Sequence, residues 1–456
     1  MRVDRSRLPD VGPDPAFKFP AIVRHRLGNG LDVRTVEHHT VPVITFVMQI
    51  EGGLGADPSG QEGLAAMTAD MVDEGTGALG AIEVAEALAA IGAEYDVEVG
   101  ADATVFTLTT LARFVERGAA LLVDILLRPS LHEADFHRVQ RLRLDRVRQL
   151  RDLPPAVAER AFLGLMYGEH PYGHLAIGTE PALLRLGPEH VLDFHARTFR
   201  PTRAILSMAG PMSHDRLRTI ADEALSGWHD DASSTAMTAA ADVEPVASPP
   251  QLAVVARDAA AQSELRMGHL SARRNNPDYP ALLVMNAVLG GQFVSRINLR
   301  LREEKGFTYG ARTGFDWRRG TSPFVLQASV HTAATAEAIR DCLAEFDALR
   351  GARPPSDAEM TLAKASLTRG YPRNFETAQQ VARSVAQLAL YGLPDTYFEE
   401  FIPKVNAVDA ADVVRVAQRY VDPMRTVTLV VGDHQTVGDS LRSLGLGEPR
   451  LLPAEV

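Results

Sequence analysis

The chain is organised around residues 289–310, which read Leu289-Gly-Gly-Gln-Phe-Val-Ser-Arg-Ile-Asn-Leu-Arg-Leu-Arg-Glu-Glu-Lys-Gly-Phe-Thr-Tyr-Gly310. A Gly-Gly pair opens this segment. Apolar residues then recur every four positions from Phe293 to Leu301, and Gly306 stands where a helix C-cap belongs. The pattern predicts a loop, then a helix, then a strand.

Two hydrogen-bond donors converge if this prediction holds. Arg302 would lie near the end of the helix and Tyr309 at the start of the next strand. Such a pair, held on rigid elements, can bind a peptide carbonyl or stabilise an oxyanion. The alternative is a surface arginine and a strand tyrosine that only pack.

The run from Ser295 to Tyr309 resembles the C-terminal-half signature of the inverzincin (M16) metallopeptidases, which include the mitochondrial processing peptidases, insulin-degrading enzyme and pitrilysin. The resemblance implies that Arg302 and Tyr309 contact substrate and assist a zinc site. It also suggests that the loop at Gly290 and Gly291 guides the peptide, although a simple turn is the favoured role for these glycines.

A second segment, residues 52–76, is similar to the zinc helix of the same family, whose hallmark is His-x-x-Glu-His inside a Gly-Leu-Ala … Gly-Thr frame. The frame is kept at residues 63–65 and 75–76. The two histidine positions of the hallmark hold Ala66 and Asp70, and the glutamate position holds Ala69.

The family's third zinc ligand is a glutamate on a later helix. Judged by the Asp152-Leu-Pro154 that follows, its position here is Arg146, or Asp145 if the alignment shifts by one. An arginine at this position would repel a cation. Zinc needs about three protein donors, and Ala69 cannot act as the general base that activates water. We therefore expect no metal in this chain and zinc in a partner subunit.

Other polar clusters are weaker metal candidates. His132 and His137 are five residues apart, which places them about 140° apart on a helix, and the segment from His170 to His174 is broken by Pro and Gly. A further hypothesis is an independent hydrolase that binds an unusual metal through the acidic residues Asp70, Asp73, Glu74 and Asp145. Acids on a solvated helix face are the simpler interpretation.

Composition sets the broad class. The 456 residues are 46% hydrophobic and 23% charged, which indicates a soluble globular chain, and the net charge of −11 argues against nucleic acid as a main partner. The single cysteine, Cys342, excludes an internal disulfide and fits a core position. Residues 1–20 lack the apolar core of a signal peptide, which makes the cytoplasm the default compartment; a periplasmic location stays open because a signal peptide may already have been removed.

The two halves of the chain look like diverged copies. In each, a helix leads through a Pro turn into an apolar strand ending in Gly, at residues 190–210 and 412–432. Residues 230–250 are rich in small residues and Pro and are expected to form a linker. The predicted domains are an N-terminal extension (1–22), a domain with a degenerate zinc motif (23–229), the linker (230–250) and a domain with the Arg/Tyr motif (251–456).

Strand patterns alternate with helices, and hairpin patterns occur at residues 23–50 and 311–331. These patterns predict two homologous α+β domains, each a mixed or antiparallel sheet packed with helices. The resemblance implies that the two domains form a clamshell.

The resemblance also implies a function. Some M16 enzymes combine a chain carrying His-x-x-Glu-His with a chain carrying the Arg/Tyr pair, around a chamber that holds an unfolded peptide. The first hypothesis is that this chain is the noncatalytic Arg/Tyr subunit, inactive alone, although a homodimer in the absence of its partner is possible. The alternative is a structural or peptide-holding subunit with no role in catalysis.

Overall fold

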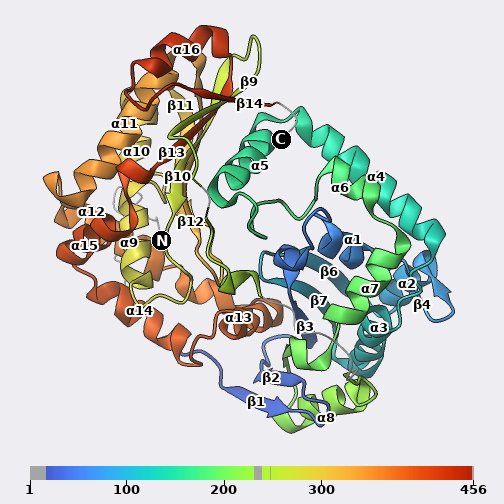
Figure 1. Ribbon diagram of the computed structural model, residues 1–456. Coiled ribbons are helices and arrows are strands. Elements are labelled where there is room, and N and C mark those ends of the chain that lie inside the picture. The colour runs from blue at the N-terminus through green and yellow to red at the C-terminus, as the bar shows by residue number, and fades with distance from the viewer. Residues whose placement is uncertain (1–16, 231–238, 247, 454–456) are drawn as a thin grey trace, which may run out of the picture.

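The computed structural model describes residues 17–230, 239–246 and 248–453, and it contains two six-stranded sheets (Figure 1). In spatial order, the first sheet comprises β1 (Ile22–Arg26), β2 (Asp32–Glu37), β8 (Ala204–Gly210), β3 (Val43–Glu51), β7 (Ala103–Leu111) and β6 (Glu94–Val99). The second comprises β11 (Thr308–Phe315), β12 (Pro323–His331), β10 (Gln262–Leu270), β13 (Val427–Gly432), β9 (Leu252–Ala256) and β14 (Arg450–Leu452). A short ribbon pairs β4 (Gly75–Thr76) with β5 (Leu79–Gly80).

The two sheets share one topology. The late strand β8 inserts between β2, to which it is parallel, and β3, to which it is antiparallel. In the second sheet β13 inserts in the same way between β9 and β10. Only one edge differs, since β1 pairs antiparallel with β2 whereas β14 pairs parallel with β9. The mixed sheets of the predicted α+β fold are therefore confirmed.

The hairpins expected from the sequence form with the expected chain direction. Strands β1 and β2 pair antiparallel with Arg26 opposite Asp32, and β11 pairs antiparallel with β12. The continuous apolar run of β3 occupies a central position between β8 and β7, which buries both of its faces.

The helices of the N-terminal half form two groups. One group covers a face of the first sheet and consists of α2 (Ala81–Ala90), α3 (Val115–Leu127) and α8 (His214–Leu225). The other group packs beside that sheet around its own apolar cluster and consists of α1 (Leu64–Met71), α4 (Glu133–Arg151), α6 (Glu180–Arg185) and α7 (Pro188–Thr198).

The helices of the C-terminal half gather mainly on one face of the second sheet (Figure 1). They are α9 (Tyr279–Leu289), α10 (Arg296–Asn298), α11 (Thr335–Asp347), α12 (Asp357–Thr368), α14 (Tyr397–Ala407), α15 (Ala410–Tyr420) and α16 (His434–Arg442). The buried Cys342 lies on α11 in this core. No helix in the described ranges combines the length and hydrophobicity needed to cross a bilayer.

The halves exchange one helix each. α5 (Pro154–Tyr167), from the N-terminal half, packs on β10 and β13 of the second sheet, and its Phe162 belongs to the same apolar cluster as Leu429 of β13. α13 (Ala378–Leu390), from the C-terminal half, packs on β3 and β8 of the first sheet. Figure 1 shows α5 in teal beside the yellow and red strands and α13 in orange beside the blue strands. Each sheet is thus completed by the other half of the chain.

Segments expected to be peripheral also contact the core. Phe19, within the expected N-terminal extension, is buried against Phe375 and Phe398 of the C-terminal half. In the expected linker, Ala240 and Ala241 are buried, while residues 231–238 and 247 lie outside the described residues, as do residues 1–16. Within residues 52–76, the segment that resembles the zinc helix, the helix α1 spans Leu64–Met71.

Candidate functional site

A β-bulge positions Tyr309. The pairing register between β11 and β12 shifts between Thr308 and Ala311, so Tyr309 and Gly310 stand outside the regular ladder. The Thr308 hydroxyl donates to the Ser329 carbonyl across the strands at 2.7 Å and accepts from the Gly310 amide at 3.1 Å, which fixes the bulge. The Tyr309 side chain is fully exposed (100%), so its hydroxyl is available to a ligand.

A single asparagine joins the preceding helix to this strand. β11 is the edge strand of its sheet, and on its free side the amide nitrogen of Asn298 donates to the Ala311 carbonyl at 2.7 Å. The Asn298 side-chain oxygen accepts from the Ala311 amide at 2.9 Å. The side chain thus satisfies both backbone groups of a strand residue, as a neighbouring strand would, and holds the two donor-bearing elements together.

Arg302 lies on a widened stretch of helix. After the short α10, residues Leu299–Glu304 form a π-helix instead of the continuous α-helix expected from the sequence. The Arg302 guanidinium stacks on the Phe293 ring at 3.2 Å from the centroid, and its Nε donates to Glu303 at 2.8 Å. Phe293 is itself 71% exposed, whereas the Arg302 side chain is 13% exposed, so the ring lies over the guanidinium.

The structure brings the predicted residues to one cavity of about 450 Å³. Its lining includes Gly290, Gly291, Arg302 and Tyr309. A Cβ added at Gly290 would lie 2.5 Å from the Thr313 hydroxyl, and one at Gly291 would lie 2.4 Å from the Asn286 amide nitrogen. Both glycines are therefore required by close packing as well as lining the cavity.

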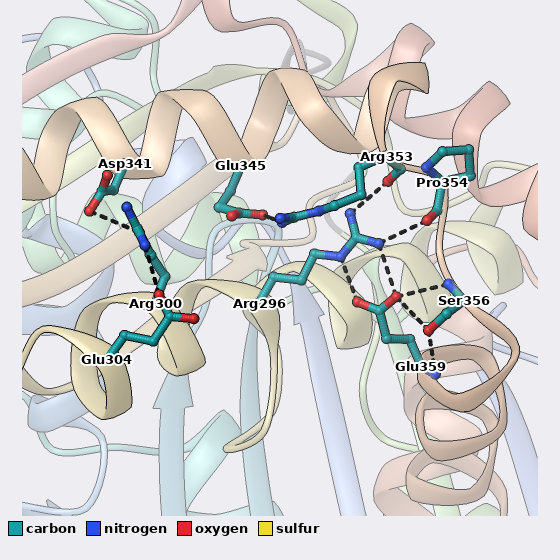
Figure 2. Close-up of polar contacts among 9 residues, drawn as sticks. All are labelled: Arg296, Arg300, Glu304, Asp341, Glu345, Arg353, Pro354, Ser356 and Glu359. Carbon is teal, nitrogen blue, oxygen red and sulfur yellow. Dashed lines mark hydrogen bonds and ion pairs between the residues drawn. The ribbon is translucent and has the colours of Figure 1, made fainter.

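A buried arginine anchors the start of this segment (Figure 2). Arg296 donates to both carboxylate oxygens of Glu359, at 2.6 and 3.0 Å, and to the carbonyls of Arg353 and Pro354. Glu359 also caps α12 through the Ser356 amide. The Arg296 side chain holds the pKa of Glu359 down at about 2.

Two further ion-pair groups in Figure 2 tie neighbouring elements together. Arg300, on the π-helix, lies between Glu304 and Asp341 of α11, and Glu345 of α11 pairs with Arg353. The element that carries Arg302 is therefore fixed to both α11 and α12.

The segment that resembles a zinc helix forms α1 but carries no zinc ligand set. Ala66 and Ala69 are buried among apolar side chains, and Asp70 is the remaining donor, with its side chain 47% exposed. The carboxylate of Asp57 accepts from the amides of Gly63 and Ala65 at the start of α1, at 2.7 and 2.6 Å. The frame residues thus preserve the helix although the donors are lost.

The remaining carboxylate, that of Asp70, forms an ion pair with an arginine. Arg143 of α4 donates to Asp70 at 2.5 Å and to the Ala176 carbonyl at 2.8 Å, and its side chain is only 9% exposed. The predicted ligand position Arg146 is exposed and donates to Gln149 at 3.5 Å. Sequence reasoning therefore identified Arg146 but missed Arg143. The helical spacing of Val139, Arg143 and Val147 could have indicated that Arg143 lies on the buried face of α4.

The remaining polar clusters do not assemble a metal site. Three acids of the hydrolase hypothesis engage separate arginines: Asp70 pairs with Arg143, Glu74 with Arg138, and Asp145 lies 3.4 Å from Arg148. Burial raises the pKa of the fourth acid, Asp73, to about 6. His170 contacts the Val243 carbonyl at 3.0 Å, and His137 lies 3.6 Å from Glu133. Among the described residues, no three His, Cys, Asp or Glu side chains are grouped so as to hold a metal. The donor set therefore does not fit zinc.

The chain thus combines two sheets of one topology with a helix in the Gly-Leu-Ala … Gly-Thr frame and a cavity lined by Arg302 and Tyr309. The chain belongs to peptidase family M16. Residues 33–180 match the insulinase (peptidase family M16) model, and residues 185–367 match the model of the peptidase M16 inactive domain.

Known relatives agree in length and fold. The chain is 24% identical over 363 residues to an uncharacterized zinc protease of Mycobacterium tuberculosis, covering 78% of this chain and 80% of the relative. A crystal structure of a peptidase M16 inactive domain from Pseudomonas fluorescens superposes with a TM-score of 0.84 at 20% identity, covering 90% of this chain and 98% of the other. A protease from Helicobacter pylori superposes with a TM-score of 0.82 at 19% identity, covering 90% and 99%.

Proposed function

We propose that this chain is the noncatalytic subunit of a heteromeric zinc metallopeptidase. It binds an unfolded peptide and supplies Arg302 and Tyr309 to the zinc site of a partner that carries His-x-x-Glu-His. The observation that carries the proposal is the contrast between the two sites: the Arg/Tyr cavity is formed and open, whereas Asp70 is neutralised by Arg143.

The two donors suit a peptide carbonyl that becomes negatively charged during hydrolysis. The Tyr309 hydroxyl is a neutral donor at the end of a bulge, and the Arg302 guanidinium is a permanent cation. Donors aimed at a developing oxyanion lower the barrier because they interact more strongly with the transition state than with the substrate. The chain's own part in the reaction is thus to bind and polarise the carbonyl.

Arg302 already lines the cavity, and the contacts that hold it there are individually weak. They are a cation–π contact with Phe293, an ion pair with the exposed Glu303 and a 3.5 Å hydrogen bond to the Phe293 carbonyl, and the Arg302 side chain is itself 13% exposed. The cation–π contact and the ion pair are each worth roughly 0.5–1 kcal/mol. A hydrogen bond from a charged group to a substrate carbonyl is worth about 1.5–3 kcal/mol, so a bound substrate can outweigh any one of these contacts and turn the guanidinium toward its carbonyl.

The experiment measures cleavage of an unstructured quenched peptide by this chain, by the His-x-x-Glu-His partner, and by an equimolar mixture. We expect activity only in the mixture, with bound zinc recovered in the partner. Zinc-dependent cleavage by this chain alone would contradict the proposal.

The same measurement distinguishes the alternative, structural function from the proposed one. A structural or peptide-holding subunit would bind the partner but leave its activity unchanged. A partner that is fully active alone, and a mixture that cleaves no faster, would therefore favour the structural role.

A further inference from the structure

The Arg/Tyr cavity continues into a second cavity of about 330 Å³, which lies between α5 of the N-terminal half and the strands of the second sheet. Arg312 and Gln327 line both cavities. The second cavity is walled on one side by Glu159 and Phe162 of α5. The two cavities therefore form one trough, which runs along β11 away from Tyr309.

The middle of the trough is a polar row across three strands. Arg312 on β11 pairs in register with Gln327 on β12, and Gln327 pairs with Arg266 on β10. Side chains in one such row share a face of the sheet. Since Ala311 and Thr313 on either side of Arg312 are buried, Arg312 points to the opposite, open face.

The two arginines of this row differ in whether a carboxylate pairs with them. Arg266 is buried and donates to Glu264 at 2.6 Å and to the Pro155 carbonyl at 3.2 Å. Arg312 is exposed, and within residues 17–230, 239–246 and 248–453 no side chain or carbonyl engages its guanidinium. The other charges that line the trough are Glu264, which pairs with Arg266, Arg302, which pairs with Glu303, the exposed Glu159 on α5, and Asp316, which pairs with Arg318 at 2.7 Å. Among the arginines that line the trough in the described part of the chain, Arg312 is thus the one without a carboxylate partner.

We propose that Arg312 is a specificity-determining residue that binds an acidic side chain of the peptide substrate. Arg312 lies three positions after Tyr309 on β11, with Gly310 and Ala311 between them, so at about 3.3 Å per residue the two are at most roughly 10 Å apart, and the bulge shortens this separation. An extended peptide whose scissile carbonyl lies at Tyr309 therefore places an acidic residue about three positions away on Arg312. This inference rests on the proposed function for the position of the scissile bond.

The net charge of −11 does not oppose this preference. At physiological ionic strength the screening length is about 8 Å, so groups within the trough dominate the potential that a bound side chain meets. A guanidinium can also bind a carboxylate in a bidentate manner, which selects acidic residues over neutral ones.

The test uses matched peptides that carry Asp or Lys at successive positions on both sides of one scissile bond, cleaved by the mixture with the zinc partner. We expect Asp about three residues from the bond to lower KM by about five-fold relative to Lys. Arg312→Ala should remove this preference and Arg312→Glu should reverse it. Arg340→Ala, which alters an exposed arginine on α11 outside the trough, should leave the preference intact.

A second measurement is independent of catalysis. Fluorescence anisotropy of labelled Asp and Lys peptides reports binding to this chain alone, where the Asp peptide should bind about five-fold tighter and only while Arg312 is present. Equal binding of the two peptides, no detectable binding, or a preference unchanged by Arg312→Ala would overturn the inference. If the mixture is inactive but the Asp peptide still binds in an Arg312-dependent manner, the proposed function is overturned and the inference about Arg312 is retained.

Discussion

A few residues decide which functional groups of the zinc motif are absent from this chain and which remain. Alanine at positions 66 and 69 removes a zinc ligand and the general base, and the remaining carboxylate of Asp70 is held by Arg143. An arginine with its side chain 9% exposed needs a counter-charge, because burying an unpaired cation is costly. Asp70 therefore has a structural role in this chain.

Substitution of Asp70 tests that role. Asp70→Ala should lower the free energy of unfolding by about 1–2 kcal/mol, since it removes the carboxylate paired with Arg143 and leaves the hydrogen bond to the Ala176 carbonyl. Half-exposure of Asp70 keeps the effect below that of a fully buried pair. Urea unfolding measures the difference. Asp145→Ala, which removes an exposed carboxylate 3.4 Å from Arg148, should change stability by less than about 0.5 kcal/mol, and equal effects would contradict this role.

For individual residues, the sequence predicted which side chains belong to the site better than it predicted which side chains contact each other. It identified the missing donors and placed Arg302, Tyr309, Gly290 and Gly291 at positions that line one cavity. It did not identify Arg312, since an exposed strand arginine is visible as unpaired only when every neighbouring charge is located.

The element that bears Arg302 is irregular and firmly anchored. Its π-helical form was not predicted, because a spacing of four fits an α-helix and the extra residue per turn leaves no mark in the apolar pattern. Asn298 ties it to β11, and Arg296 ties it to α12. Wider turns of this kind are often found at functional sites, where they re-aim a side chain.

Glu359 makes this anchor dependent on pH. Its pKa is lowered to about 2 by Arg296, so its stabilising contribution is complete above about pH 4.5 and is lost as the pH falls toward 2. The contribution is at most about 3 kcal/mol, and solvent screening reduces it because the Glu359 side chain is 33% exposed. Denaturant unfolding of the protein and of Glu359→Gln should therefore differ most near pH 6 and converge toward pH 2.

A matched variant isolates this effect from general acid denaturation. Glu304→Gln alters an exposed partner of Arg300 on the neighbouring ion-pair group and should give a stability difference that changes little with pH. A Glu359→Gln difference that stays constant from pH 6 to pH 3 would contradict the anchoring role.

The whole molecule is built by exchange between its halves. The repeat of one topology was visible in the sequence, because each copy keeps the pattern of a helix, a Pro turn and an apolar strand. The exchange of α5 and α13 between the halves was not visible in the sequence, because an apolar helix face does not reveal which sheet it covers. Sequence patterns report local periodicity, whereas helix docking depends on tertiary packing.

This exchange predicts that neither half folds alone. A fragment of residues 1–229 lacks α13, and a fragment of residues 251–456 lacks α5, so each leaves one apolar sheet face uncovered. Separately purified fragments should show weak near-UV circular dichroism and rapid proteolysis, and mixing them should restore both properties toward those of the intact chain. Monomeric fragments with native near-UV spectra would contradict the prediction.

The account depends most on whether Arg302 and Tyr309 act in the active site of another chain. The decisive measurement is kcat/KM for an unstructured peptide in the mixture with the zinc partner, using Arg302→Ala, Tyr309→Phe and, as the control, Arg340→Ala, which alters an exposed arginine on α11 outside the cavity. Loss of either donor should lower kcat by about 10²-fold or more while the affinity between the subunits is unchanged, and the control should keep full activity. Full activity of the mixture with both donors removed would show that they take no part in the reaction.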